Sequence, residues 1–246
     1  MAEVHNDLRL RATATVVGAV SPGMQLPEMV NAHGKGRCAI TLDPRNRQEG
    51  QQPYQGVVPL VGEGGAPLMD LAAVVEHYMR QSEQLDTTLV LAADEQVAAG
   101  LLIQRLPVQG QDNLSQSSVA REDAGEAAED DYQRIAILAK SLKREELLGL
   151  DADTILRRLF WEENLMRFEP LAGAQGPRFA CSCSRSRVAA MLKGLGQDEA
   201  EDILKEQGQI EVGCDFCGQQ ERFDAVDVGR LFTPAAQQSP EPGSVQ

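Results

Sequence analysis

Four cysteines near the C-terminal end constrain this chain more than any other feature. The first pair is Cys181-Ser182-Cys183, and after thirty intervening residues comes Cys214-Asp215-Phe216-Cys217, which Gly218 follows. Four thiolates suit the tetrahedral coordination of zinc, and a glycine after the second pair can adopt the positive φ that turns backbone amides toward a sulfur. The spacing predicts that the reduced protein holds one zinc ion through four ligands: Cys181, Cys183, Cys214 and Cys217.

The overall composition disfavours several classes of partner. Among 246 residues, 37 acidic and 23 basic side chains give a formal net charge of -14, which repels phosphate backbones and anionic lipid. The first residues lack the basic and apolar regions of a secretory signal, and no apolar run approaches the roughly 18 residues that a membrane span needs. Grouped cysteines in a reducing compartment bind metal more often than they form structural disulfides. We therefore expect a cytoplasmic protein that binds neither nucleic acid nor membranes.

Apolar periodicity predicts an N-terminal domain over residues 1–107, built mainly from antiparallel sheet with a helix. Three segments alternate apolar and polar residues, as half-buried strands do: 8–17, 37–42 and 55–61. An amphipathic helix is expected to begin near Leu68 and to end near Ser82. Apolar stretches at 88–92 and 99–106 predict a hairpin that returns to the same sheet.

A linker with helical segments is expected at 108–178. Within it, residues 121–131 carry six carboxylates against one arginine, which is typical of a solvated loop. Helical spacing resumes at 135–142 and again from a cap at Asp153. The aromatic side chains just before the cysteines are expected to pack against neighbouring surfaces: Phe160, Trp161, Phe168 and Phe179.

A small zinc-binding module is expected at 179–232, followed by a disordered tail at 233–246 that is rich in Pro, Gln, Ser and Gly. Three elements are predicted inside the module: a helix at 188–195, a hairpin that pairs 210–212 with 221–223, and a short helix capped by Asp224. The predicted fold class is therefore α+β, with a mainly antiparallel N-terminal domain, a helical linker and a C-terminal zinc module.

The zinc site has two interpretations. In the first, the metal only stabilises a module that is too small to bury a sufficient core. In the second, an oxidant converts the thiolates to Cys181–Cys183 and Cys214–Cys217 disulfides and the metal is released. A structural zinc contributes about 10–16 kcal/mol to the folding free energy of its module. Each of these disulfides closes a very short loop and restrains the unfolded chain little, so it cannot replace the metal. Oxidation would then unfold the module.

Other segments accompany the cysteine pairs: Tyr54-Gln55-Gly56-Val57-Val58-Pro59-Leu60, Glu76-His77-Tyr78, Gln81-Ser82-Glu83-Gln84-Leu85 and Gly100-Leu101-Leu102-Ile103-Gln104. Together, over roughly Leu8 to Phe232, these segments resemble the redox-regulated chaperone family called heat shock protein 33. That family has a longer N-terminal domain, so the resemblance implies a chain that lacks the N-terminal part of a typical member.

The resemblance implies a holdase chaperone and not an enzyme. In that family the reduced, zinc-bound form is a folded, inactive monomer. Oxidation releases the zinc, unfolds the zinc module and the adjacent linker, and yields an ATP-independent holdase that is active as a homodimer on unfolded client proteins. Carried over to this chain, the four cysteines would be both the zinc ligands and the redox sensors, with the C-x-x-C pair oxidising first.

Two other functions compete with this hypothesis. One is a zinc-ribbon module with purely structural zinc that binds a partner or nucleic acid, which the acidic charge opposes. The other is a thiol oxidoreductase that uses Cys214 and Cys217, although no βαβ pattern precedes that pair. Neither accounts for the C-x-C pair. The fifth cysteine, Cys38, lies in a strand pattern and is expected to be a small buried side chain.

Overall fold

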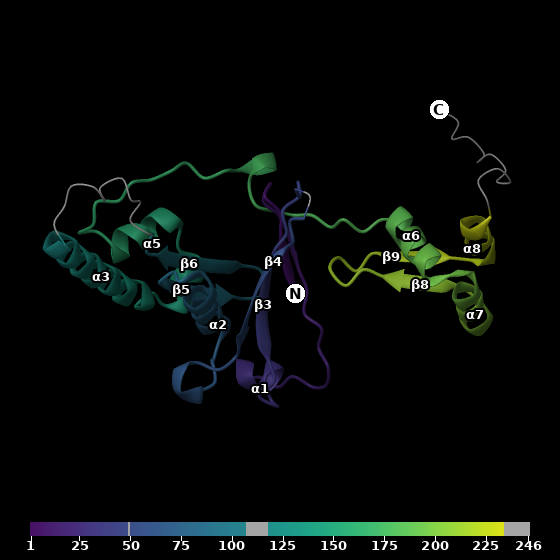
Figure 1. Ribbon diagram of the computed structural model, residues 1–246, viewed down its shortest axis with the longest axis horizontal. Helices are drawn as coiled ribbons and strands as arrows, with labels where there is room; N and C mark the ends of the chain where they lie inside the picture. Colours follow the sequence, from purple (N-terminus) through teal and green to yellow (C-terminus); the bar gives the residue numbers. More distant parts are fainter. Residues whose placement is uncertain (49, 107–117, 234–246) are drawn as a thin grey trace. The chain divides into compact units, whose positions relative to one another are not determined.

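The computed structural model describes residues 1–48, 50–106 and 118–233 (Figure 1). Helices and short, mostly antiparallel strands mix along this part of the chain, which confirms the predicted α+β class. The chain divides into two compact units. One is Gly18–Met166, and the other combines Met1–Val17 with Arg167–Gln246.

Two hairpins form the sheets of the Gly18–Met166 unit. Strand β3 (Arg37–Leu42) pairs antiparallel with β4 (Tyr54–Pro59), and β5 (Thr87–Ala93) pairs antiparallel with β6 (Ala98–Gln104). These strands lie where the sequence predicts them. The two hairpins form separate sheets, so the expectation that the second returns to the sheet of the first is wrong. The helix α2 (Leu71–Tyr78) follows β4 in the chain and contacts both β4 and β5, so the two hairpins pack against this helix and not against each other's strand edges.

Helix α2 (Leu71–Tyr78) begins later than the sequence predicts. The carboxylate of Asp70 accepts a hydrogen bond from the backbone N–H of Ala73 at 2.7 Å, so Asp70 caps the helix and Leu68 lies outside it. A π-helical turn (Met79–Glu83) continues α2 to the predicted end. The same unit also contains a short helix, α1 (Leu26–Val30), and a 3-10 turn (Glu63–Gly65).

The ring of Tyr78 packs against the backbone of β4. A Cβ atom at Gly56 would lie 2.4 Å from the Tyr78 hydroxyl oxygen, so only glycine fits there without displacing the ring. The Tyr78 hydroxyl donates a hydrogen bond to the Glu83 carboxylate at 3.1 Å. These contacts connect three of the segments that carry the family resemblance.

Three helices follow the second hairpin: α3 (Ser118–Lys140), α4 (Arg144–Gly149) and α5 (Ala152–Leu159). Residues 121–131 lie inside α3, so the loop predicted there is wrong; alanine, glutamate and arginine are strong helix formers, and their propensity outweighs the repulsion between carboxylates. Helix α5 is capped by Asp151 and not by Asp153, since the Asp151 carboxylate accepts from the Thr154 N–H at 2.9 Å. Among the described residues, no helix has the length and apolar character needed to cross a membrane.

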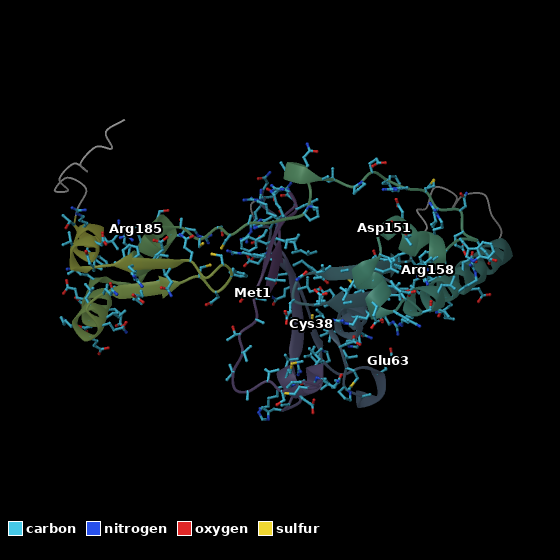
Figure 2. The ribbon with its side chains drawn as sticks, turned by 180° about the vertical axis from the view of Figure 1, so that it is seen from behind. Met1, Cys38, Glu63, Asp151, Arg158 and Arg185 are labelled. Atoms are coloured by element: carbon cyan, nitrogen blue, oxygen red, sulfur yellow. The ribbon has the colours of Figure 1, made fainter. Side chains whose placement is uncertain are left out.

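One buried cluster of this unit lies where α4 and α5 meet the β5–β6 hairpin. Its buried members are Leu142, Leu147 and Ile155, against which half-buried residues of β5 and β6 pack. Arg158 of α5, labelled in Figure 2, forms an ion pair with Glu146 of α4 at 2.5 Å. These contacts bind the helical segment to the second hairpin.

The aromatic residues before the cysteines differ in burial. Phe160 is buried at the end of α5, but Trp161 is 75% exposed and Phe168 is 84% exposed. Phe179 is also exposed. The expectation that all four pack against a surface is therefore wrong for three of them. For Trp161 and Phe168, no regular helix or strand extends over residues 160–171 to orient the side chain toward a core. Phe179 lies in a strand of only two residues, and its side chain remains exposed there.

The other unit begins with an N-terminal hairpin of β1 (Ala2–Val4) and β2 (Arg9–Ala12). Strand β7 (Arg178–Phe179) adds to β2 in parallel, although these strands lie far apart in the sequence. The strand expected at 8–17 is thus shorter than predicted, because only its first half finds partner strands. A second sheet pairs β8 (Ile210–Gly213) with β9 (Gln220–Phe223), as the sequence predicts.

Three helices pack against the β8–β9 hairpin: α6 (Arg185–Leu195), α7 (Gln197–Gln207), which was not predicted, and α8 (Ala225–Phe232). A 3-10 turn (Gly173–Gln175) precedes β7. The Asp224 carboxylate caps α8 as predicted, accepting from the Asp227 N–H at 2.8 Å. Arg185, labelled in Figure 2, pairs with Asp227 at 2.7 Å and lies over the Phe223 ring at 4.2 Å. The buried core of this module consists of Leu192, Ala200, Ile210, Phe223 and Val228.

The compact units do not follow the domain limits expected from the sequence, since the N-terminal hairpin groups with the cysteine-bearing part of the chain. Those limits stay a prediction. The predicted tail lies outside the described residues from position 234 on.

Candidate metal centre

The structure brings together all four cysteines that the sequence predicts as ligands. Their four sulfur atoms all lie within 4.8 Å of one another, and no disulfide joins them. The sulfurs of Cys181 and Cys214 are 3.4 Å apart, and those of Cys183 and Cys217 are 3.3 Å apart. We call these four residues the cysteine cluster. Each of these two contacts joins the C-x-C pair to the C-x-x-C pair.

Local structure places the C-x-C pair between β7 and α6. Strand β7 ends at Phe179, and the backbone N–H of Ala180 still donates to the carbonyl of Leu10 at 3.1 Å. Immediately after Cys183, the Ser184 side chain caps α6 by accepting from the Arg187 N–H. Short ordered elements on both sides therefore fix the direction of this pair.

The C-x-x-C pair lies in the turn between β8 and β9. The backbone N–H of Cys214 donates to the Gln219 carbonyl at 2.9 Å, and the N–H of Gly218 donates to the Cys214 carbonyl at 2.8 Å. Gly218 has a φ of 72°, which confirms the positive φ that the sequence predicts. The hairpin thus brings both sulfurs of this pair to one side of a tight turn.

The sulfurs of the C-x-C pair have very different proton affinities. The backbone N–H of Cys183 donates to the sulfur of Cys181, and this hydrogen bond lowers the pKa of Cys181 to about 6. The hydrogen bond with Cys217 raises the pKa of Cys183 to about 12. Four sulfurs this close cannot all be thiolates without a cation to offset their charge.

The geometry of the cluster fits a tetrahedral metal ion. Zinc–sulfur bonds of about 2.3 Å give sulfur–sulfur edges of about 3.8 Å, which fall between the shortest contacts and the 4.8 Å limit of the cluster. All four donors are sulfur, the ligand set of structural zinc sites. These residues can hold one metal ion. That the ion is zinc, and that the four cysteines are its ligands, stay predictions.

The structure adds one residue that no sequence motif indicates. Arg11, on β2, directs its guanidinium to the sulfur of Cys181 at 3.7 Å and lies over the ring of Phe216 at 4.1 Å. In the sequence, Arg9 and Arg11 each follow a leucine, and no local signal distinguishes one arginine from the other.

Cys38 does not belong to the cluster. It lies half-buried in β3, in the Gly18–Met166 unit, and burial raises the pKa of its thiol. A protonated thiol reacts slowly with oxidants, which agrees with the expectation of a small packed side chain.

A comparison with protein families assigns the chain to a family. The family model described as "Hsp33 protein" matches residues 1–224. The chain belongs to the Hsp33 family. The resemblance stated from the sequence is thereby confirmed, and the match takes in the N-terminal hairpin as well as both cysteine pairs.

Curated relatives agree with this assignment. Proteins named "33 kDa chaperonin" from Methylobacillus flagellatus and Chromobacterium violaceum are each 41% identical to the chain, over 94% of it and 68% of their own length. One from Nitrosococcus oceani is 39% identical over 95% of this chain and 69% of its own length. The chain therefore spans about two thirds of the length of these Hsp33-family relatives.

A solved structure shares the fold. The crystal structure of the 33 kDa chaperonin from Thermotoga maritima matches with a TM-score of 0.63 at 21% identity, covering 94% of this chain and 71% of that one. The mixed α+β architecture is thus that of an Hsp33 structure.

Proposed function

We propose that this protein is a redox-regulated, ATP-independent holdase chaperone that acts in the cytoplasm. It is inactive when reduced and zinc-bound, and oxidation of the cysteine cluster activates it to protect unfolded client proteins from aggregation. The observation that carries the proposal is the cluster of four free cysteines, mutually within 4.8 Å, in a chain of the Hsp33 family.

The chemistry of the switch is a two-electron oxidation of each cysteine pair. Bound zinc would supply charge neutralisation that keeps all four sulfurs as thiolates. When peroxide is the oxidant, two thiolates form one S–S bond and transfer two electrons. The peroxide O–O bond breaks, and two protons complete two water molecules. The proposed bonds are Cys181–Cys183 and Cys214–Cys217, and their formation removes the ligands of the metal.

Loss of the metal is expected to unfold the module, because its own core is small. Five residues are buried in it, one of them an alanine. A structural zinc contributes about 10–16 kcal/mol, as much as a whole domain's net stability of about 5–15 kcal/mol. Unfolding would expose the buried Leu192, Ile210, Phe223 and Val228 side chains.

The client-binding surface is proposed to include the segment before the module. Several large apolar side chains of residues 161–171 are already exposed: Trp161, Leu165, Met166, Phe168 and Leu171. Exposed apolar groups of this kind bind the apolar surfaces of unfolding proteins. In keeping with the family resemblance, we further propose that the oxidised form is a homodimer and that it catalyses no reaction.

The test measures zinc content and free thiols before and after peroxide treatment, together with light scattering from a heat-denatured client in the absence of ATP. The proposal expects one zinc and four oxidisable cluster thiols in the reduced protein, and suppression of scattering only after oxidation. A Cys38→Ser variant serves as the control and should behave like the parent protein, because Cys38 lies outside the cluster. Zinc loss without any gain in client protection would favour a purely structural zinc site.

A further inference from the structure

Arg11 is held close to the cysteine cluster by backbone pairing. Strand β2 pairs with β1 on one side, where Arg11 faces Glu3, and with β7 on the other. The parallel pairing of β2 with β7 runs directly into the C-x-C pair. Arg11 is therefore placed beside that pair by a strand of its own unit, and its side chain is only 14% exposed.

The guanidinium of Arg11 contacts both cysteine-bearing segments, at Cys181 in one and at Phe216 in the other. Its Nη1 lies 3.7 Å from the sulfur of Cys181 and donates to the Ser182 hydroxyl at 3.1 Å, so it touches the C-x-C pair. Its Cζ lies 4.1 Å from the centre of the Phe216 ring, between the two cysteines of the C-x-x-C pair. One planar cation thus bridges the two pairs.

A carboxylate fixes the orientation of this side chain. Oε2 of Glu3 accepts a hydrogen bond from Nε of Arg11 at 2.7 Å and lies 2.6 Å from Nη2 in an ion pair. This pairing leaves Nη1 directed at the sulfur and the flat face directed at the ring, a geometry that lysine cannot reproduce. The nearby Arg187 donates to the carbonyl and hydroxyl of Ser182.

We propose that Arg11 is a positioning residue of the metal centre: it holds the two cysteine pairs together and donates to the Cys181 sulfur, and so controls how tightly the metal is bound and how readily the sulfur is oxidised. The inference rests on the proposed metal-binding function of the cluster. Four thiolates around a divalent ion carry a net charge of about −2, which a fixed guanidinium offsets. A donor to a ligand sulfur also withdraws electron density from it, making the sulfur less nucleophilic.

The test compares the full-length reduced protein with Arg11→Met and Arg11→Lys variants, using Arg9→Met as the matched control. Arg9 lies on the same strand, but it pairs with Asp7. Zinc affinity is measured by competition with a chromophoric chelator. Cobalt is then substituted for zinc, because the sulfur-to-cobalt charge-transfer band reports directly on the electron density at the sulfurs. The rate of metal release by peroxide is the third measurement.

We expect Arg11→Met to weaken zinc binding about 10- to 100-fold, the usual effect of removing a group that supports a metal ligand. It should also shift the charge-transfer band and speed metal release several-fold. Arg11→Lys should fall between Arg11→Met and the parent protein, because it keeps the charge but loses the planar bridge. Arg9→Met should match the parent in all three measurements.

An Arg11→Met variant with parental affinity, band position and release rate would overturn the inference. So would an equal effect of Arg9→Met, because the hairpin as a whole would then be responsible. These outcomes are separable from the fate of the proposed function. A parent protein that binds neither zinc nor cobalt refutes both, whereas one that binds metal but never protects clients refutes only the chaperone switch.

Discussion

Truncating Leu192 tests whether folding of the module and metal binding are one event. Leu192 lies in α6, is 1% exposed, and packs in a cluster to which α7, α8, β8 and β9 also contribute. Five elements surround this side chain, so filling the space that Leu192→Ala leaves would require several of them to shift together. We therefore expect the cavity to persist.

The size of the effect follows from this burial. Leucine-to-alanine changes in cores cost about 2–5 kcal/mol. If the metal-free module is unfolded, the whole cost appears in the apparent zinc affinity, since binding and folding are then coupled. At 1.4 kcal/mol for each factor of ten, zinc binding should weaken roughly 30- to 3,000-fold. The zinc-loaded variant should still fold, because the metal contributes about 10–16 kcal/mol.

The assay is chelator competition under reducing conditions, with far-ultraviolet circular dichroism of the metal-free and zinc-loaded forms. Leu195→Ala is the matched control. Leu195 ends the same helix three residues later, but it is 50% exposed and lies outside the cluster. Its truncation should change zinc affinity by no more than a few-fold.

Two results would refute the reasoning. Parental zinc affinity in Leu192→Ala would mean that the module folds without the metal, so that the core and the ligands contribute independently. An equal loss in Leu195→Ala would mean that burial does not determine the effect.

Further predictions concern the ligands, the first hairpin and the tryptophan. Cys214→Ser should lower zinc affinity severely in the same competition assay, because a four-coordinate site has no spare ligand; tight stoichiometric zinc in that variant would contradict the ligand assignment. Gly56→Ala should lower the thermal midpoint, because its Cβ would lie 2.4 Å from the Tyr78 hydroxyl, whereas Gly149→Ala, with open space around its Cβ, should not. Trp161, the only tryptophan, is 75% exposed, so its emission should already be red-shifted in the reduced protein and should move little in concentrated urea. A blue emission that shifts on unfolding would mean that the indole is buried in solution.

The elements around the cysteine cluster were predictable because their signals are local. A C-x-x-C pair followed by Gly218 requires a tight turn, and Asp224 at the start of an apolar pattern requires a helix cap. The hydrogen bonds that Gly218 and Asp224 make in these two features join residues no more than four positions apart in the sequence. The predicted hairpin and last helix therefore have nearly the same ranges as the observed ones.

The errors in the middle of the chain arise where two local signals compete. In residues 121–131, charge density favours a solvated loop and residue propensity favours a helix, and the helix formed. In the exposed segment that contains Trp161 and Phe168, apolar composition suggests burial. Composition alone does not provide a surface to pack against, and these side chains remain exposed.

Arg11 illustrates what local patterns cannot contain. Its role depends on a parallel pairing of β2 with a strand of two residues about 170 positions away, and such a short strand has no periodicity to detect. Arg9 and Arg11 are both arginines on β2, two residues apart. Arg9 nevertheless pairs with the nearby Asp7, whereas Arg11 faces the sulfur of Cys181. The difference comes from the register of β2 against β7. Arg9 lies opposite Arg178, whereas Arg11 lies two residues further along β2, beside the C-x-C pair that follows β7. The position of a residue relative to a distant partner, and not its own pattern, decides whether it belongs to the centre.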